Sequence, residues 1–178
     1  MREIVQEGAP VLRESAKPVP EELFGSAALG EMLSDMAEAL AAEPEGVALA
    51  APQIGLPYRL FILRADRAVD RKPPPADKPV PEPEPRVEIY INPEITKSSR
   101  KRHEADEGCL SVRHIYGTTR RHERVTLRAR AADGSTFERG ASGLRAQIFQ
   151  HEVDHLNGTL FTDHAKDLVR IEPAHVAA

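Results

Sequence analysis

The chain has 178 residues, a length that suits one domain with a substantial hydrophobic core. Hydrophobic residues make up 40% of the sequence and charged residues 29%, which is the balance of an ordinary soluble protein. The formal net charge of −4 argues against nucleic acid or an anionic membrane as the main partner, so we expect a single domain over residues 1–178 that binds neither.

The N-terminal residues predict an arm rather than a targeting signal. Residues 1–7 carry charge where a signal peptide needs an apolar run, and no segment approaches the ~20 apolar residues of a membrane-spanning helix. We therefore expect a cytoplasmic protein without a membrane anchor. Apolar residues on both sides of a break at Gly8 and Pro10 predict that residues 1–13 pack against the body of the domain.

A helix, a stretch of small residues and a strand follow in that order. Residues 26–42 repeat leucine and methionine at steps of three and four, which predicts an amphipathic helix. Residues 45–55 are mostly small, so their backbone can approach another strand or a ligand closely. Gln53 is the one polar side chain between Gly46 and Gly55, and it either serves a site there or points to water from a loop. Residues 58–63 predict a strand.

A proline-rich segment separates the two halves of the chain. Seven of the fifteen prolines fall between Pro73 and Pro85, mixed with charged residues. Such a composition cannot form a core, so we expect an exposed surface loop at about residues 66–86. The alternative is a peptide-docking motif that recruits a partner.

The second half alternates in a way that is typical of strands. Residues 87–91 predict a strand that stops at Asn92-Pro93, and residues 98–103 predict a basic, solvated strand or loop. Residues 120–131 alternate, turn at Asp133-Gly134 and return over residues 136–139, which predicts a hairpin. The basic residues of this run are expected on the outer face of the strand.

The single cysteine, Cys109, lies between these strands. It cannot form an internal disulfide. Its neighbours, residues 106–111 (D-E-G-C-L-S), are polar and predict a turn, which favours an accessible thiolate that acts as a ligand or a nucleophile. The alternative is the common fate of a lone cysteine, a small buried hydrophobic residue.

Residues 147–158 predict a helix that carries a metal site. His151 and His155 are four residues apart, so both imidazoles can bind one metal ion from the same helix face. Glu152 follows the first histidine, which gives the H-E-x-x-H pattern of a metal-assisted hydrolase with a carboxylate base. The alternative is a chance pair on a solvated face, but the apolar neighbours predict a buried helix whose polar groups need partners. Gly158 is expected to end the helix.

The third ligand of this site has several candidates. The extended zinc peptidase pattern requires a histidine at the position of Phe161, so that pattern fails. Glu172 lies in a tail that we expect to be frayed. A short extended piece is predicted at residues 159–161, and a helix over residues 163–170 follows it. Asp163, His164 and Asp167 in this helix are weak candidates. Cys109 is the best remaining ligand. Taken together, the elements predict an α+β fold in which mostly antiparallel sheets pack around a central metal-binding helix.

Three segments resemble, in order, the motifs of peptide deformylases. These segments are residues 46–53 (G-V-A-L-A-A-P-Q), 107–111 (E-G-C-L-S) and 150–155 (Q-H-E-V-D-H). The resemblance implies that Cys109, His151 and His155 bind one divalent metal, natively Fe(II), with Zn, Ni or Co possible in preparations. It implies that Glu152 is the general base and acid, and that Gln53 and the Leu110 N–H stabilise the oxyanion.

The implied reaction removes the formyl group from the N-terminal formylmethionine of new polypeptides and releases formate. Metal-bound water would attack the formyl carbon after losing its proton to Glu152. The resemblance assigns Gly46, Ala48 and Gly108 to substrate binding, with the peptide added as a strand along residues 46–50. Nascent formylmethionyl peptides are therefore the expected partners.

The sequence departs from the family pattern at three places. Ala48 replaces a second glycine, and residues 112–116 replace the usual turn after the cysteine motif. Only fifteen residues follow Asp163, so we do not expect ribosome docking through a long C-terminal helix. Glu107 is expected to orient the cysteine loop through Arg121. The other histidines are expected on the surface: His103, His114, His122, His164 and His175.

Three other functions compete with deformylation. A metallopeptidase or amidase would use the same chemistry on unformylated peptides, although Phe161 and the Cys109 ligand argue against it. A non-catalytic relative would bind metal or formyl-peptide only, which the intact Glu152 and Gln53 argue against. An interaction module would depend on the proline-rich loop.

Overall fold

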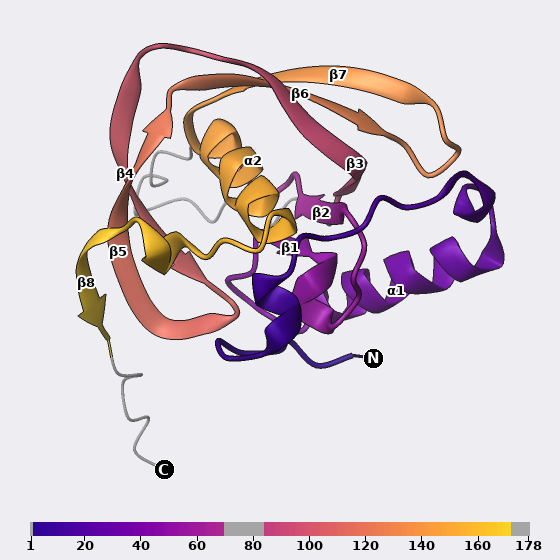
Figure 1. The fold of residues 1–178 in the computed structure, drawn as a ribbon, viewed down its shortest axis with the longest axis horizontal. Coiled ribbons are helices and arrows are strands. Elements are labelled where there is room, and N and C mark those ends of the chain that lie inside the picture. The colour runs from indigo at the N-terminus through magenta and orange to yellow at the C-terminus, as the bar shows by residue number, and fades with distance from the viewer. Residues whose placement is uncertain (1, 70–83, 172–178) are drawn as a thin grey trace.

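The structure is a computed structural model, and it describes residues 2–69 and 84–171. Within these ranges the fold is α+β, with antiparallel sheets and two α-helices, as the sequence predicted (Figure 1). One sheet has the order β1-β2-β3-β6-β7: Ala48–Ala50, Leu60–Arg64, Val87–Ser98, Arg124–Arg130 and Thr136–Ser142. The other has the order β4-β5-β8: Arg102–Cys109, Val112–His122 and Lys166–Arg170. The helices are α1, Ala27–Ala41, and α2, Gly143–Leu156.

Helix α2 packs on the five-stranded sheet and also meets β5 of the smaller sheet. It contacts β1, β3, β6 and β7 as well as β5, and Figure 1 shows it lying between the two sheets. Phe149 anchors the packing, because its ring lies 5.1 Å from the Tyr90 ring and 6.0 Å from the Phe61 ring. The helix contains the H-E-x-x-H string, so this packing holds the string between the sheets.

Helix α1 matches the predicted helix to within one residue at each end. Ser26 is its N-cap and accepts a hydrogen bond at Oγ from the Leu29 backbone N–H at 3.2 Å, which satisfies one of the donors at the start of the helix. Its leucine and methionine face is buried against β1, β2 and the short 3-10 helix Ala51–Ile54. The predicted 3.6-residue period therefore marked the buried face.

The N-terminal arm packs on the domain and joins two of its parts. The Val5 N–H donates to the Gln53 carbonyl at 2.8 Å, and the Glu7 N–H donates to the Ser111 carbonyl at 2.7 Å. The short 3-10 helix Pro10–Arg13 follows, with Leu12 fully buried. The predicted arm is confirmed.

Strand β3 continues past Asn92-Pro93, so the predicted stop there was wrong. A β-bulge between Ile91 and Glu94 takes the proline out of the regular ladder. Asn92 has a positive φ of 50°, and its side chain is held by the Val19 backbone, accepting at 2.8 Å and donating at 3.0 Å. These long-range bonds let the strand bend instead of ending.

The segments around Cys109 form a hairpin rather than a loop. Cys109 ends β4, and β5 begins at Val112, so the residues 112–116 that replace the usual turn form the start of a strand. The basic run from residue 120 is divided between β5 and β6, with a break at Glu123. Arg121 faces inward and is 6% exposed, so the expectation that this run lies on an outer face was wrong at that residue.

The segment after α2 was also predicted incorrectly. Residues 161–163 form a 3-10 helix, and Lys166–Arg170 form strand β8 instead of a helix. Strand β8 adds to the edge of β5, with Tyr116 opposite Val169 and Ile115 opposite Arg170. Residues 166–170 have no strong hydrophobic period of their own. Hydrogen bonding to the backbone edge of β5 therefore determines that they form a strand.

Parts of two predictions lie outside the described residues. The surface loop at about 66–86 includes residues 70–83, and the tail begins at residue 172. Asp66 accepts at Oδ1 from the Arg86 N–H at 3.0 Å, and the Ala65 N–H donates to the Arg86 carbonyl, so the two flanks of the loop are hydrogen-bonded to each other.

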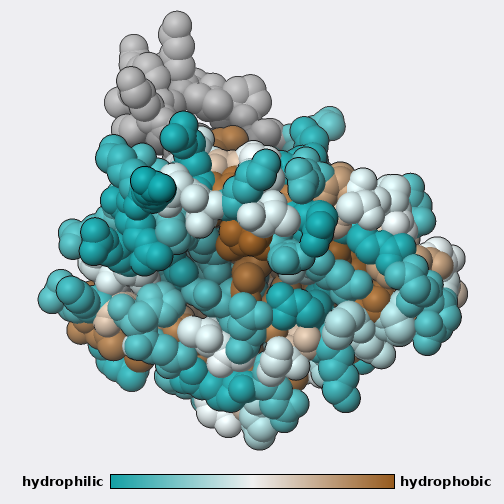
Figure 2. All heavy atoms as spheres, turned by 45° about the horizontal axis from the view of Figure 1, so that its top comes forward, coloured by the Kyte–Doolittle hydropathy of each residue, from teal (hydrophilic) through white to brown (hydrophobic). Residues whose placement is uncertain are grey.

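Within the described ranges, no helix is long and apolar enough to cross a membrane. The face in Figure 2 is mostly hydrophilic, with hydrophobic atoms visible in a central hollow and near its edges.

Candidate metal centre and active site

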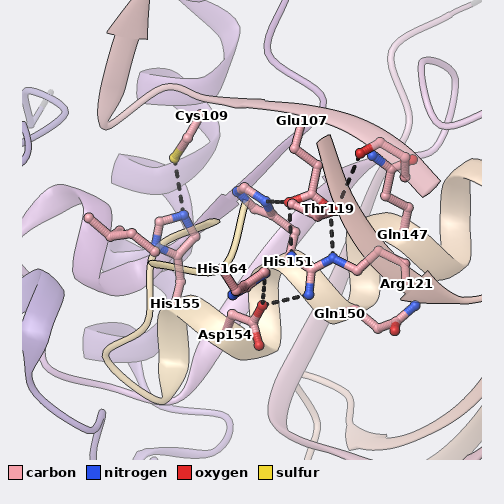
Figure 3. A network of polar contacts seen from close by, with 12 residues as sticks. Glu107, Cys109, Thr119, Arg121, Gln147, Gln150, His151, Asp154, His155 and His164 are labelled. Atoms are coloured by element: carbon pink, nitrogen blue, oxygen red, sulfur yellow. Dashed lines mark hydrogen bonds and ion pairs between the residues drawn. The ribbon is translucent and has the colours of Figure 1, made fainter. Parts of the chain in front are cut away.

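Three potential metal ligands converge from two elements. Helix α2 carries His151 and His155, and the end of β4 carries Cys109. Their candidate ligand atoms all lie within 4.8 Å of one another, and the Cys109 Sγ is 3.2 Å from the His155 Nε2 (Figure 3). One thiolate and two imidazoles suit a divalent transition metal and leave a position open for water or substrate. These residues therefore fit such an ion.

Glu107 organises the space behind His151. Its Oε1 is 2.6 Å from the Arg121 Nε, and its Oε2 accepts from the Arg121 Nη2 at 2.8 Å. The same Oε2 lies 3.0 Å from the Nδ1 of His151 (Figure 3). The predicted pairing of Glu107 with Arg121 is confirmed. The contact between Glu107 and the Nδ1 of His151 orients the imidazole ring and leaves the other ring nitrogen, Nε2, for a metal ion.

Two members of this network were missed by sequence reasoning. The Thr119 Oγ1 donates to the Glu107 Oε1 at 2.9 Å, and the Asp154 Oδ2 accepts from the Arg121 Nη1 at 2.6 Å. Asp154 lies one turn after Gln150 and His151 within α2, so its helical position was a usable signal. Thr119 had no such signal, because only the β4–β5 pairing brings it to Glu107.

Buried charges shift the proton affinities of this network. Burial would raise the pKa of Glu107, but hydrogen bonds from Arg121 and His151 hold it well below its usual range. Burial alone would lower the pKa of His151, yet hydrogen bonds with Cys109 and Glu107 raise it. His155 differs, because burial and the neighbouring His151 charge both lower its pKa.

Gln53 is buried and oriented, so the alternative in which it points to water is wrong. Its side-chain carbonyl accepts from the Ala50 N–H at 2.8 Å. The amide Nε2 is thereby directed toward the site, 3.2 Å from the Ser111 Oγ and 3.5 Å from the Cys109 Sγ. The 3-10 helix that follows β1 supplies this geometry.

Glu152 is a buried carboxyl group without an ion-pair partner in the described ranges. It is 4% exposed, and its Oε2 has no hydrogen-bond partner among the described residues. Burial raises the pKa of Glu152 to about 7. A carboxyl group with this pKa can both accept and donate a proton near neutral pH.

A cavity of about 760 Å³ opens onto these groups. Its walls include Cys109, Gln53, His151 and Glu152. They also include Leu110, the second predicted oxyanion donor, and the residues predicted to bind substrate: Gly46, Ala48 and Gly108. Strand β1 is at the edge of its sheet, so one side of its backbone has no neighbouring strand in the described sheet. The arrangement can receive an extended chain next to a buried acid–base group.

The weaker ligand candidates do not join the cluster. Asp163 pairs with Arg13 at 2.6 Å, while His164 and Asp167 are exposed. Phe161 is buried, with its ring centre 6.2 Å from that of His151. Of the other histidines, His114 is exposed as expected. His103 and His122, which were also predicted to be exposed, are half-buried. His175 lies outside the described residues.

Comparison with known proteins gives the family. A family model described as polypeptide deformylase matches residues 1–170. The peptide deformylase of Heliobacterium modesticaldum is 38% identical over 165 residues, which cover 93% of this chain and 94% of that protein. The peptide deformylase of Brucella suis is 38% identical over 161 residues, 90% of this chain and 82% of that protein.

Solved structures agree. The Met-Ala-Ser-bound crystal structure of the class I type b peptide deformylase from Acinetobacter baumannii has a TM-score of 0.78 and 32% sequence identity, covering 92% of this chain and 99% of that chain. The chain therefore belongs to the polypeptide deformylase family. Its relatives are enzymes, and the expected resemblance is confirmed.

Proposed function

We propose that this enzyme removes the formyl group from the N-terminal formylmethionine of newly made polypeptides and releases formate. The observation that carries the proposal is the cluster of Cys109, His151 and His155 beside Glu152, on one cavity with Gln53. Family membership supports the same conclusion independently. We further propose that residues 1–178 act as one deformylase domain in the cytoplasm, where new polypeptides are made.

Cys109, His151 and His155 would hold one divalent metal, natively Fe(II), with Zn, Ni or Co as substitutes in preparations. When bound, such an ion supplies a Lewis acid and lowers the pKa of a water molecule toward ~7. Glu107 orients His151 from the far side, so a mutation at Glu107 would weaken metal binding without removing a ligand.

Glu152 is the proposed general base and acid. It would take the proton of the attacking water and return it to the amine that leaves. Its raised pKa, about 7, suits both steps because neither protonation state is strongly favoured at neutral pH. The lack of an ion-pair partner in the described part of the chain supports this role over a structural one.

Gln53 and the backbone N–H of Leu110 are the proposed oxyanion donors. The Ala50 N–H fixes the Gln53 carbonyl and so leaves its amide N–H groups directed toward Cys109. A donor held in advance stabilises developing negative charge without reorganisation, and removing one such donor typically costs ~10²–10³ in rate.

The edge of β1 is the proposed place for the peptide. An extended chain would pair along residues 46–50, between this edge and the end of β4, with Gly108 and Ala48 as small wall residues. The Acinetobacter deformylase structure that matches this fold is described as Met-Ala-Ser bound, which supports an N-terminal methionine peptide as ligand.

The test is formate release from formyl-Met-Ala-Ser by protein purified without oxygen and loaded with Fe(II). We expect turnover by the natural sequence and a loss of about 10²–10⁴-fold in Glu152→Ala, because general acid–base catalysis contributes about that factor. Glu138→Ala, an exposed glutamate on β7, is the matched control and should be fully active. Release of amino acids from an unformylated peptide, without formate from the formylated one, would instead indicate a peptidase.

A further inference from the structure

Large hydrophobic side chains gather on the ribbon formed by β5 and β8. Six large hydrophobic residues are exposed in the described ranges, and four of them lie on or directly after these strands. They are Tyr116 at 40%, Leu168 at 49%, Val169 at 52% and Ile171 at 56% exposed. Isolated exposed hydrophobic residues need no explanation, but a contiguous group commonly marks a contact surface.

Strand pairing sorts these four residues onto two faces. Tyr116 is directly opposite Val169, so their side chains share one face of the ribbon. The Ile171 N–H donates to the His114 carbonyl at 2.8 Å, which continues the pairing, and Ile171 lies two residues after Val169 and therefore on the same face. Leu168 lies on the other face, where its Cδ2 is 2.7 Å from the position that a Cβ on Gly117 would occupy.

The face with Tyr116, Val169 and Ile171, which we call the β5–β8 shelf, continues the candidate active-site cavity. Tyr116 and Ile171 line that cavity together with Cys109 and Glu152. The Tyr116 ring also covers Gly108, since its Cε1 is 2.7 Å from the position of a Cβ there. The shelf therefore begins at the wall of that cavity and extends outward along β8.

We propose that the β5–β8 shelf is a specificity determinant that binds an apolar side chain downstream of the formylmethionine. This inference rests on the proposed function, because it assigns a further contact of the same substrate. Residues 46–48 line the same cavity as Tyr116 and Ile171, so a peptide that enters along β1 and continues across the cavity would place its later residues on that wall. Three side chains are too small a surface for a stable dimer, which needs about 800 Å² from each partner, so a second copy of the chain is the weaker occupant.

The experiment compares kcat/KM for formyl-Met-Ala-Ser with that for formyl-Met-Leu-Ser and formyl-Met-Ala-Leu. For one of the leucine peptides we expect a preference of about fivefold, as partial burial of one leucine side chain would give. The preference should lie in KM, because the shelf is away from the reacting groups. Ile171→Ser and Val169→Ser should each reduce it toward one, while Leu168→Ser, matched in exposure and strand, should retain it.

The outcomes separate this inference from the proposed function. Turnover of all three peptides with equal kcat/KM would overturn the shelf but leave deformylation intact. An equal loss of preference in Leu168→Ser would also overturn it. Dimerisation of the natural sequence that Ile171→Ser abolishes, measured by sedimentation, would assign the shelf to a second copy instead. No turnover of any peptide would refute the proposed function, and this inference with it.

Discussion

Two ion pairs of this protein have the same N–O distance and opposite surroundings. Arg121 and Glu107 are 2.6 Å apart beside the candidate metal centre, with side chains 7% and 2% exposed. Arg128 and Glu94 are also 2.6 Å apart, across β6 and β3, with side chains 52% and 63% exposed. Distance alone does not set the value of an ion pair, because water screens the exposed pair and has little access to the buried one.

The buried pair is part of the site, whereas the exposed pair is independent of it. The Glu107 carboxylate also contacts His151 and Thr119, so it holds three side chains in place, including Arg121. Removing one partner of such a group leaves an uncompensated charge in the interior, which is the main cost. The exposed pair leaves two hydrated side chains when it breaks.

The largest expected effect is that of Glu107→Ala. It should lower the free energy of unfolding by about 3–5 kcal/mol, because Arg121 loses its main partner. It should also weaken metal binding by about 10–100-fold, because His151 loses the acceptor at Nδ1. Urea unfolding of the metal-free protein and a metal titration measure the two effects separately. Normal stability together with normal activity would refute the role assigned to Glu107.

Metal binding should stabilise the buried region by a comparable amount. At a free metal concentration about 1,000 times the Kd, the expected gain is ~4 kcal/mol in the free energy of unfolding. Thermal unfolding with and without added Zn(II) measures it, and Cys109→Ser should reduce the gain strongly. An equal gain in the Cys109→Ser protein would mean that the ion binds elsewhere. Glu94→Gln, at the exposed pair, should keep the full gain.

A smaller, pH-dependent effect is expected at a third pair, Arg64 and Asp66, which are 2.7 Å apart with side chains 11% and 5% exposed. The hydrogen bond from Arg64 holds the pKa of Asp66 well below 3.8, its ordinary value. The unfolded chain therefore takes up this proton first as the pH falls. The contribution to stability is complete above about pH 4 and declines progressively below it. Asp66→Asn should reduce the stability difference between pH 7 and pH 3 in urea unfolding. An unchanged difference would contradict this sign.

The smallest effect is expected for Glu94→Gln. The free energy of unfolding should change by less than about 1 kcal/mol, and the change should shrink further in high salt, where exposed charges are screened. Urea unfolding at low and high ionic strength is sufficient. A loss as large as that of Glu107→Ala would break the comparison, since equal distance would then mean equal energy.

Local patterns predicted the parts of the fold that have a strong period or a strong motif. The leucine and methionine spacing of α1, the hairpin of β6 and β7, and the positions of His151 and His155 on one helix follow from side-chain geometry alone. The pairing of Glu107 with Arg121 was also predicted, from the expectation that Glu107 orients the cysteine loop through an arginine. Where a residue's environment was set by distant segments, prediction failed, as it did for the continuation of β3 through Pro93 and for strand β8.

The sequence by itself determined the family, the α+β class and the residue types offered to the site, because motifs and periods are local properties of the chain. Only the tertiary structure decided that the candidate ligand atom of Cys109 lies within 4.8 Å of those of His151 and His155, and that Gln53 is turned toward the cysteine by the Ala50 N–H. It also decided that β8 brings Ile171 to the cavity wall. Sheet pairing and helix packing set these contacts, and both depend on residues far apart in the chain.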